Sequence, residues 1–151
     1  MEIEWNGFLK NAVEAFPNEV CAFLFSRKPY SLEEKWFVFQ VKNISDTPKN
    51  SWIPDRKEML AIKSKAVKMR LVKIGNIHTH PYRGNDDIED ECKPSEMDLG
   101  FARKFNDIIR GIMVVDNKTI YGIKFHDKFG NEIPIVVEQF DNKEARHSSQ
   151  A

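Results

Sequence analysis

Apolar positions near the start of the chain recur at helical spacing and then gather into short runs. Residues 3–15 fit an amphipathic helix that Pro17 would end. Its apolar face would comprise Trp5, Phe8, Leu9, Ala12, Val13 and Phe16. Two runs follow, EVCAFLFS from Glu19 and KWFVFQVKNI from Lys35 to Ile44, and their aromatic and β-branched residues predict two strands.

In the middle of the chain, segments with helical spacing of apolar residues alternate with short apolar runs. SDTPKN is a predicted loop and SWI a short strand, and a second helix opens at Pro54-Asp55, where Asp55 and Glu58 have the spacing of a capping box. Its apolar face would comprise Met59, Ile62, Ala66 and Met69. LVKIGNIH predicts a third strand, and a third helix would start near Ser95. The apolar stripe of that helix would comprise Met97, Phe101, Phe105 and Ile108.

Three further apolar runs, GIMVVD, TIYGIKFH and EIPIVVEQF, predict the closing strands, with turns at Asp116-Asn117 and at residues 129–131. Because no repeat or linker interrupts this order, we expect one α/β domain over residues 1–140. Residues 141–151 are rich in polar side chains and are expected to form a flexible tail.

The composition fits one globular domain and excludes several function classes. The chain has 151 residues, of which 41% are hydrophobic and 30% charged. Lys and Arg total 23, as do Asp and Glu, so the zero net charge gives no support for nucleic-acid binding. No run approaches the roughly 20 apolar residues that span a bilayer, and the N-terminus lacks a signal-peptide core. Two cysteines do not suggest a disulfide framework, so we expect a cytoplasmic protein without membrane partners.

Candidate chemistry is concentrated between residues 74 and 100. His78 and His80 lie two apart at the end of a predicted strand, so both imidazoles would face one side and share one ion. Zinc accepts nitrogen and carboxylate ligands, and Asp98 in the first turn of the next helix is the best third candidate. Two ordinary alternatives stay open. Strand-end histidines are often only exposed, and Ser95 with Asp98 also fits a helix-capping pattern that needs no metal.

The combined motifs resemble a known family. H-T-H-P at residues 78–81 and P-S-E-M-D at residues 94–98 resemble the JAMM signature, H-[S/T]-H-P…S-x-x-D, of the MPN+ (JAB/Mov34) zinc metalloproteases. That family also carries a glutamate in a segment like P-x-E-x-C-G-x-L, and FPNEVCAFLF places Pro17, Glu19, Cys21 and Leu24 at matching positions. Ala22 stands where the family often has glycine.

The order of predicted elements is similar to that family from about residue 5 to 138. The resemblance therefore implies a compact prokaryotic- or viral-type JAB domain, with a mixed β-sheet flanked by helices in a cytidine-deaminase-like arrangement. It also implies that His78, His80 and Asp98 bind Zn²⁺ with a water in the fourth position, and that Glu19 exchanges protons with this water and the leaving amine. Ser95 would help to hold the oxyanion.

Two features bear on access to this site. The stretch between Pro81 and Ser95 is longer than in many family members and includes an acidic loop at residues 85–91. It would shape substrate access, or it is only a solvated loop. Cys92 lies three residues before Ser95, where some deubiquitinating JAMM enzymes carry a cysteine, so it is a candidate for the substrate groove; a passive thiol is the alternative.

By resemblance, the chain is a metallo-isopeptidase that cleaves after the tail of a ubiquitin-like or sulfur-carrier (β-grasp) protein. One setting is deconjugation in a bacterial antiphage pathway with ubiquitin-activating and ubiquitin-conjugating-like enzymes. The alternatives are a phage-tail-type JAB peptidase, a non-catalytic MPN scaffold and a RadC-like branch linked to DNA. Because MPN domains often pair, a homodimer is also expected.

Overall fold

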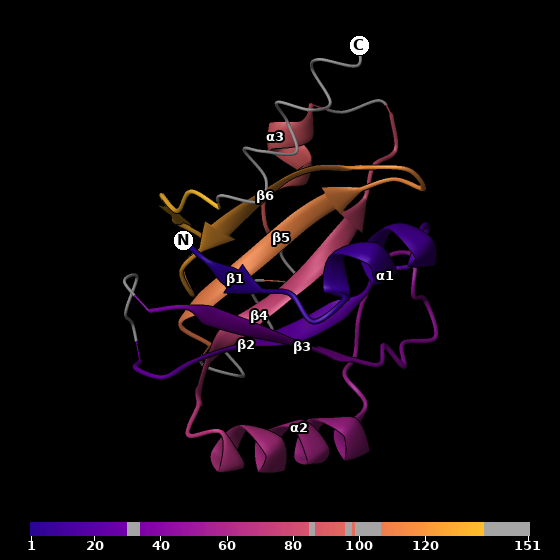
Figure 1. Ribbon diagram of the computed structural model, residues 1–151. Coiled ribbons are helices and arrows are strands. Elements are labelled where there is room, and N and C mark those ends of the chain that lie inside the picture. The colour runs from indigo at the N-terminus through magenta and orange to yellow at the C-terminus, as the bar shows by residue number, and fades with distance from the viewer. Residues whose placement is uncertain (30–33, 85–86, 96–97, 99–106, 138–151) are drawn as a thin grey trace.

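The computed structural model describes residues 1–29, 34–84, 87–95, 98 and 107–137 (Figure 1). Within these ranges the chain forms, in order, β1 (Ile3–Glu4), α1 (Phe8–Ala15), β2 (Cys21–Ser26), β3 (Trp36–Val41), α2 (Arg56–Lys68), β4 (Val72–Pro81), α3 (Ile88–Glu91), β5 (Ile109–Val115), β6 (Ile120–His126) and β7 (Glu132–Ile133). None of the helices described here is long and apolar enough to cross a membrane.

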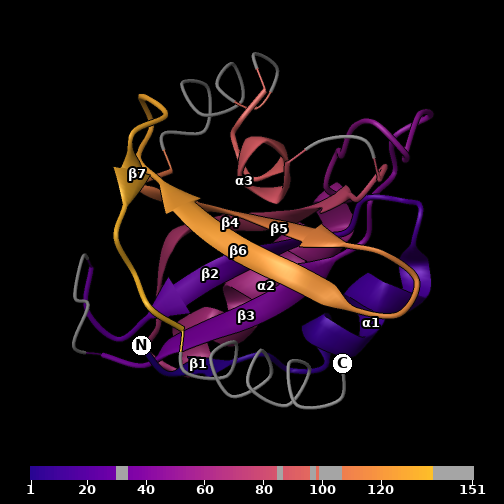
Figure 2. The same ribbon diagram turned by 90° about the horizontal axis from the view of Figure 1, so that it is seen from above.

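The strands form one mixed seven-stranded sheet, which confirms the predicted α/β class. Its order is β1-β3-β2-β4-β5-β6-β7. The β1–β3 and β4–β5 pairs are parallel and the other pairs are antiparallel. The long strand β4 therefore lies at the centre, between β2 and β5 (Figures 1 and 2).

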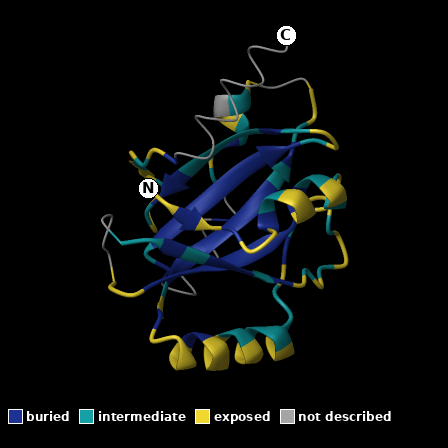
Figure 3. Cartoon of the chain, viewed as in Figure 1, coloured by how far each residue is buried: buried dark blue, intermediate teal, exposed yellow. Residues whose placement is uncertain are grey.

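Alternation along β2 divides the core between the two faces of the sheet. Ala22 and Leu24 belong to a large cluster that includes Phe8 and Ala12 of α1. Cys21, Phe23 and Phe25 belong to a second cluster. Ala66 of α2 lies in that second cluster, so the two helices cover opposite faces, and the outer surface of α2 stays exposed (Figure 3). The predicted apolar face of α2 is confirmed except for Met69, which is 43% exposed at the helix end.

The predicted helix over residues 3–15 is wrong in its first turn. Asn6 and Gly7 have positive φ values of 51° and 83°, which a right-handed helix does not allow. The helix therefore begins at Phe8, and Ile3 and Glu4 instead pair with β3. Trp5 is buried as predicted, although it precedes the helix.

Three other differences have local causes. SWI forms no strand, since only an isolated bridge joins Asn43 to Pro54. The last predicted strand is limited to Glu132–Ile133, and Pro134 has no N–H to extend the ladder. At the start of α2, the Asp55 carboxylate caps Lys57 N as expected, but Glu58 Oε2 accepts from Lys42 N rather than completing a capping box.

Some predictions fall outside the described residues. These are most of the third helix after Ser95, with its stripe at Met97, Phe101 and Phe105, and the tail at residues 141–151. The prediction is wrong for Ile108, the last member of that stripe, because it lies in a bend directly before β5 and not in a helix, although it packs against the large core cluster. Within the acidic loop, Ile88–Glu91 form the short helix α3 near β4 and β5 (Figure 2).

Candidate metal centre

Strand β4 carries both histidines, and its pleat sends them to the same side of the sheet. Thr79, between them, points to the opposite side, where its Oγ1 accepts a hydrogen bond of 2.9 Å from Val20 N. Thr79 N in turn donates to Val20 O over 3.0 Å. The middle residue of the H-x-H motif thus fastens the segment before β2 to β4.

This fastening explains why Glu19 lies at the histidines. In the β2–β4 register Cys21 is opposite His78, and the Val20–Thr79 bonds continue the pairing by one residue. Glu19 therefore falls opposite His80, on the face that carries both imidazoles. The ligand atoms of Glu19, His78 and His80 all lie within 4.8 Å of one another. Three potential metal ligands thus converge, although Glu19 lies 59 residues or more before either histidine in the sequence.

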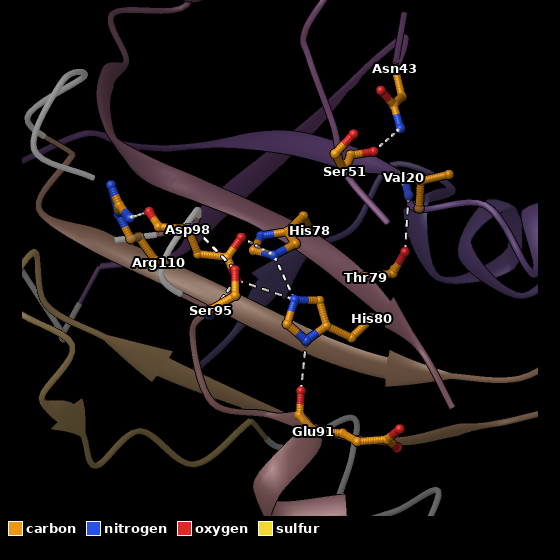
Figure 4. Close-up of polar contacts among 10 residues, drawn as sticks. All are labelled: Val20, Asn43, Ser51, His78, Thr79, His80, Glu91, Ser95, Asp98 and Arg110. Atoms are coloured by element: carbon orange, nitrogen blue, oxygen red, sulfur yellow. Dashed lines mark hydrogen bonds and ion pairs between the residues drawn. The ribbon is translucent and has the colours of Figure 1, made fainter. Parts of the chain in front are cut away.

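Asp98 adds a carboxylate to the same point (Figure 4). Its Oδ1 lies 3.2 Å from His78 Nε2 and its Oδ2 lies 3.3 Å from His80 Nε2. The two Nε2 atoms are 3.1 Å apart. With metal–ligand bonds of 2.0–2.1 Å, the edges of a tetrahedral zinc site are about 3.3–3.4 Å long. The separations of these donor atoms therefore fit a small tetrahedral ion.

The hydrogen bonding of His80 supports the same conclusion. Its Nδ1 lies 2.7 Å from the main-chain oxygen of Glu91 at the end of α3. A carbonyl oxygen only accepts, so Nδ1 carries the hydrogen, and in the neutral ring the lone pair is on Nε2. This second hydrogen bond to a carbonyl is typical of metal-binding histidines. The acidic segment thus contributes a main-chain oxygen that orients His80.

Burial and charge set the protonation of the group. Burial raises the pKa of Glu19 to about 7 and lowers the pKa of His78. Burial alone would also lower the pKa of His80, but the hydrogen bond and charge of Asp98 outweigh it and raise that pKa. Burial would raise the pKa of Asp98, yet the charges and hydrogen bonds of the two imidazoles lower it well below its usual range. Asp98 is therefore a carboxylate, and His80 holds a proton more readily than His78.

Asp98 is held from two sides. Ser95 N donates to Asp98 Oδ2 over 2.8 Å, and Asp98 N donates to Ser95 Oγ over 3.1 Å, so the S-x-x-D pair forms the predicted reciprocal cap. From β5, the buried Arg110 guanidinium donates through Nη1 to Asp98 O over 2.8 Å. The capping interpretation and the metal interpretation are therefore compatible, because the cap aims the carboxylate at the histidines.

The fold of this chain matches that of solved structures at low sequence identity. A JAB1/MPN domain protein from Archaeoglobus fulgidus is 20% identical with a TM-score of 0.54, over 91% of this chain and 98% of that one. The chain has a JAB1/MPN-type fold. A protein from Desulfitobacterium hafniense is 20% identical with a TM-score of 0.58, and the match covers 91% of this chain and 93% of that one. A protein from Salinibacter ruber is 19% identical with a TM-score of 0.59, and the match covers 91% of each chain. No protein-family model and no curated protein matches the sequence.

The JAB1/MPN-type fold brings together four of the residues that the sequence singled out, namely Glu19, His78, His80 and Asp98, with Ser95 beside them. Cys92 is buried at the end of α3, where its N–H bonds Ile88 O, and its place in a substrate groove stays a prediction.

Sequence reasoning missed the residues that support this cluster. Trp52 stacks on His78 with ring centroids 5.5 Å apart and an interplanar angle of 29°. Arg110 holds the main chain of Asp98, and Thr79 holds Val20. The sequence signals were a tryptophan in the short predicted strand SWI and an arginine directly before the apolar run GIMVVD.

Proposed function

We propose that this JAB1/MPN-type domain is a zinc-dependent isopeptidase or peptidase of the JAMM type. The observation that carries the proposal is the convergence of Glu19, His78 and His80 within 4.8 Å, with a carboxylate of Asp98 between the imidazoles. The proposed substrate is the C-terminal tail of a ubiquitin-like or sulfur-carrier β-grasp protein and the bond that follows it. Deconjugation in a bacterial antiphage pathway is one setting in which such a bond occurs.

In this proposal His78, His80 and Asp98 hold Zn²⁺. Two neutral imidazoles and one carboxylate are a donor set typical of catalytic zinc, which leaves one position for water or substrate. When bound, zinc supplies Lewis acidity, which lowers the pKa of a water molecule towards about 7 and polarises a carbonyl group.

Glu19 is the proposed general base. It is 5% exposed and lies opposite His80, so its carboxylate borders the site without being needed as a ligand. Burial raises its pKa to about 7, which suits a group that both takes and returns protons near neutral pH. It would accept the proton of the attacking water and later deliver it to the leaving amine.

Ser95 is the proposed oxyanion donor. Its Oγ accepts from Asp98 N, so the hydroxyl hydrogen is left to donate to a developing negative charge. This role needs no proton transfer by Ser95, since the water is the nucleophile.

The first test is the zinc content of the purified protein by mass spectrometry. We expect one zinc per chain in the wild type and a loss of zinc in His80→Ala. Asp90→Ala is the matched control, because Asp90 has an exposed carboxylate in α3 that pairs with Lys93. We expect the Asp90→Ala protein to keep its zinc. Full zinc in a folded His80→Ala protein, or none in the folded wild type, would refute the assignment.

A further inference from the structure

The side-chain amide of Asn43 holds the segment at residues 43–53, named here the Trp52 segment. Its Nδ2 donates to Ser51 O over 3.0 Å, and its Oδ1 accepts from Ile53 N over 3.0 Å. These two groups belong to the peptide units on either side of Trp52. One amide therefore fixes the main chain at both ends of the residue whose indole stacks on His78. Figure 4 shows the bond from Asn43 to Ser51.

The same amide also reaches the other side of the metal centre. Asn43 Nδ2 donates a second hydrogen bond, of 2.9 Å, to Glu19 O. Glu19 N donates to Pro48 O, which lies in the Trp52 segment, over 2.6 Å. Both main-chain polar groups of Glu19 are thus bonded to one segment, although Glu19 itself precedes the first residue of β2.

The capacity of Asn43 is used completely. A primary amide has two N–H donors and two acceptor lone pairs. Besides the bonds already given, Asn43 Oδ1 accepts from Ser45 N over 3.0 Å, so all four positions are occupied. No other natural side chain of this length offers two donors and two acceptors in one plane, and aspartate lacks the donors.

We propose that Asn43 is a positioning residue that couples Glu19 to the Trp52–His78 stack, so that the base and one metal ligand are oriented together. The inference rests on the proposed function, because it assigns Glu19 and His78 their roles there. Asn43 touches neither substrate nor metal in this account. It acts through the main chain of Glu19 and through the indole of Trp52.

Asn43→Asp is the sharpest perturbation. It keeps the shape and the acceptor that faces Ser45 N and Ile53 N, but it places an oxygen against the carbonyls of Glu19 and Ser51. Mutation of residues that orient metal ligands typically lowers metal affinity or activity 10- to 100-fold. We expect Asn43→Asp and Trp52→Leu each to weaken zinc binding about tenfold. We expect the loss of zinc affinity in the double variant to be much smaller than the product of the two single losses, because both residues act on one unit.

The matched control is Asn11→Asp. Asn11 donates through Nδ2 to Gln40 Oε1 over 2.7 Å, on the α1 side of the sheet, and its replacement should leave zinc affinity unchanged. Affinity is measured by competition with a chromophoric chelator, and the melting temperature of the zinc-free proteins is recorded separately. At saturating zinc, Asn43→Asp should lower kcat for cleavage of a β-grasp fusion more than it changes KM.

A second readout does not depend on zinc. In the zinc-free protein, Asn43→Asp should speed hydrogen exchange at the Glu19 amide while the amides of β5 keep their protection; Asn43→Ala repeats the test if the aspartate variant does not fold. Unchanged exchange at Glu19, unchanged zinc affinity, or fully additive effects of Asn43→Asp and Trp52→Leu would each overturn the coupling. Absence of zinc from the wild type would instead contradict the proposed function, and the exchange result would still decide the role of Asn43.

Discussion

Adding a single methyl group at Gly75 should test how closely β4, the strand that carries the histidines, packs against β5. It starts the parallel β4–β5 ladder opposite Ile109, three residues before His78. A Cβ at Gly75 would lie 1.8 Å from the main-chain oxygen of Ile109, whereas real Cβ contacts essentially never fall below 3.0 Å. The strands would therefore have to separate by at least 3.0 − 1.8 = 1.2 Å at this point.

A separation of that size disrupts one or two backbone hydrogen bonds, since adjacent strands are normally about 4.8 Å apart. Overpacking costs about 1–3 kcal/mol, and each lost hydrogen bond adds about 1 kcal/mol. Gly75→Ala should therefore lower the free energy of unfolding by about 2–5 kcal/mol. For a chain of this size, that corresponds to a fall of about 5–15 °C in Tm.

The assay is thermal unfolding followed by circular dichroism, with Gly122→Ala as the control. Gly122 lies on β6 of the same sheet, and a Cβ there would meet nothing within 4 Å. Its replacement should leave Tm unchanged or slightly higher. A Gly75→Ala protein that melts with the wild type would show that β4 and β5 do not approach as closely as described.

Three further changes probe the centre and its surroundings. Asp98→Ala should abolish zinc binding while the fold is retained, as measured by zinc content and circular dichroism; retained zinc would contradict its assignment as a ligand. Thr79→Val should lower the free energy of unfolding by about 1–3 kcal/mol, because Val20 N loses its buried acceptor; equal urea midpoints would contradict this. Burial would raise the pKa of Asp116, but hydrogen bonds from Tyr121 and two main-chain amides lower it, so its contribution to stability is present above its unfolded pKa and is lost as the pH falls through its folded pKa. The stability difference between wild type and Tyr121→Phe should therefore be larger at pH 7 than at pH 3, and a constant difference would show that Asp116 is not involved.

The elements that position the histidines could be predicted because they are local. The apolar run LVKIGNIH predicted a strand, and the two-residue repeat of a strand places His78 and His80 on one face. The order β2, β3, α2, β4, β5, β6 and β7 also agrees with the predicted elements, whereas β1 and α3 were not predicted. The error at the N-terminus arose because Trp5 and Phe8 are both buried at helical spacing although a left-handed turn separates them.

The arrangement around the histidines could not be derived from the chain alone, because it depends on pairing between distant segments. Glu19 reaches His80 only through the β2–β4 register, and nothing in residues 17–26 specifies that register. The motif resemblance pointed to Glu19, whereas the residues themselves suggested an ordinary strand start.

Asn43 and Trp52 show the same limit in another form. Asn43 resembles a simple turn residue, since its Oδ1 accepts from Ser45 N two positions on. Its bond to Glu19 O spans 24 residues and depends on where β2 begins and where β3 ends. Trp52 was predicted to lie in the short strand SWI, whereas it forms no strand there, belongs to the second core cluster and stacks on His78.

The most direct test of the proposed function compares wild type and Glu19→Gln at equal zinc content. The substrate is a linear fusion that carries a peptide after the tail of a β-grasp protein, and cleavage is measured with and without a chelator. The account predicts chelator-sensitive cleavage by the wild type and a loss of at least about 100-fold in Glu19→Gln, which keeps its zinc and its fold. Cleavage by Glu19→Gln at the wild-type rate would contradict the assignment of the general base and, with it, the proposed mechanism.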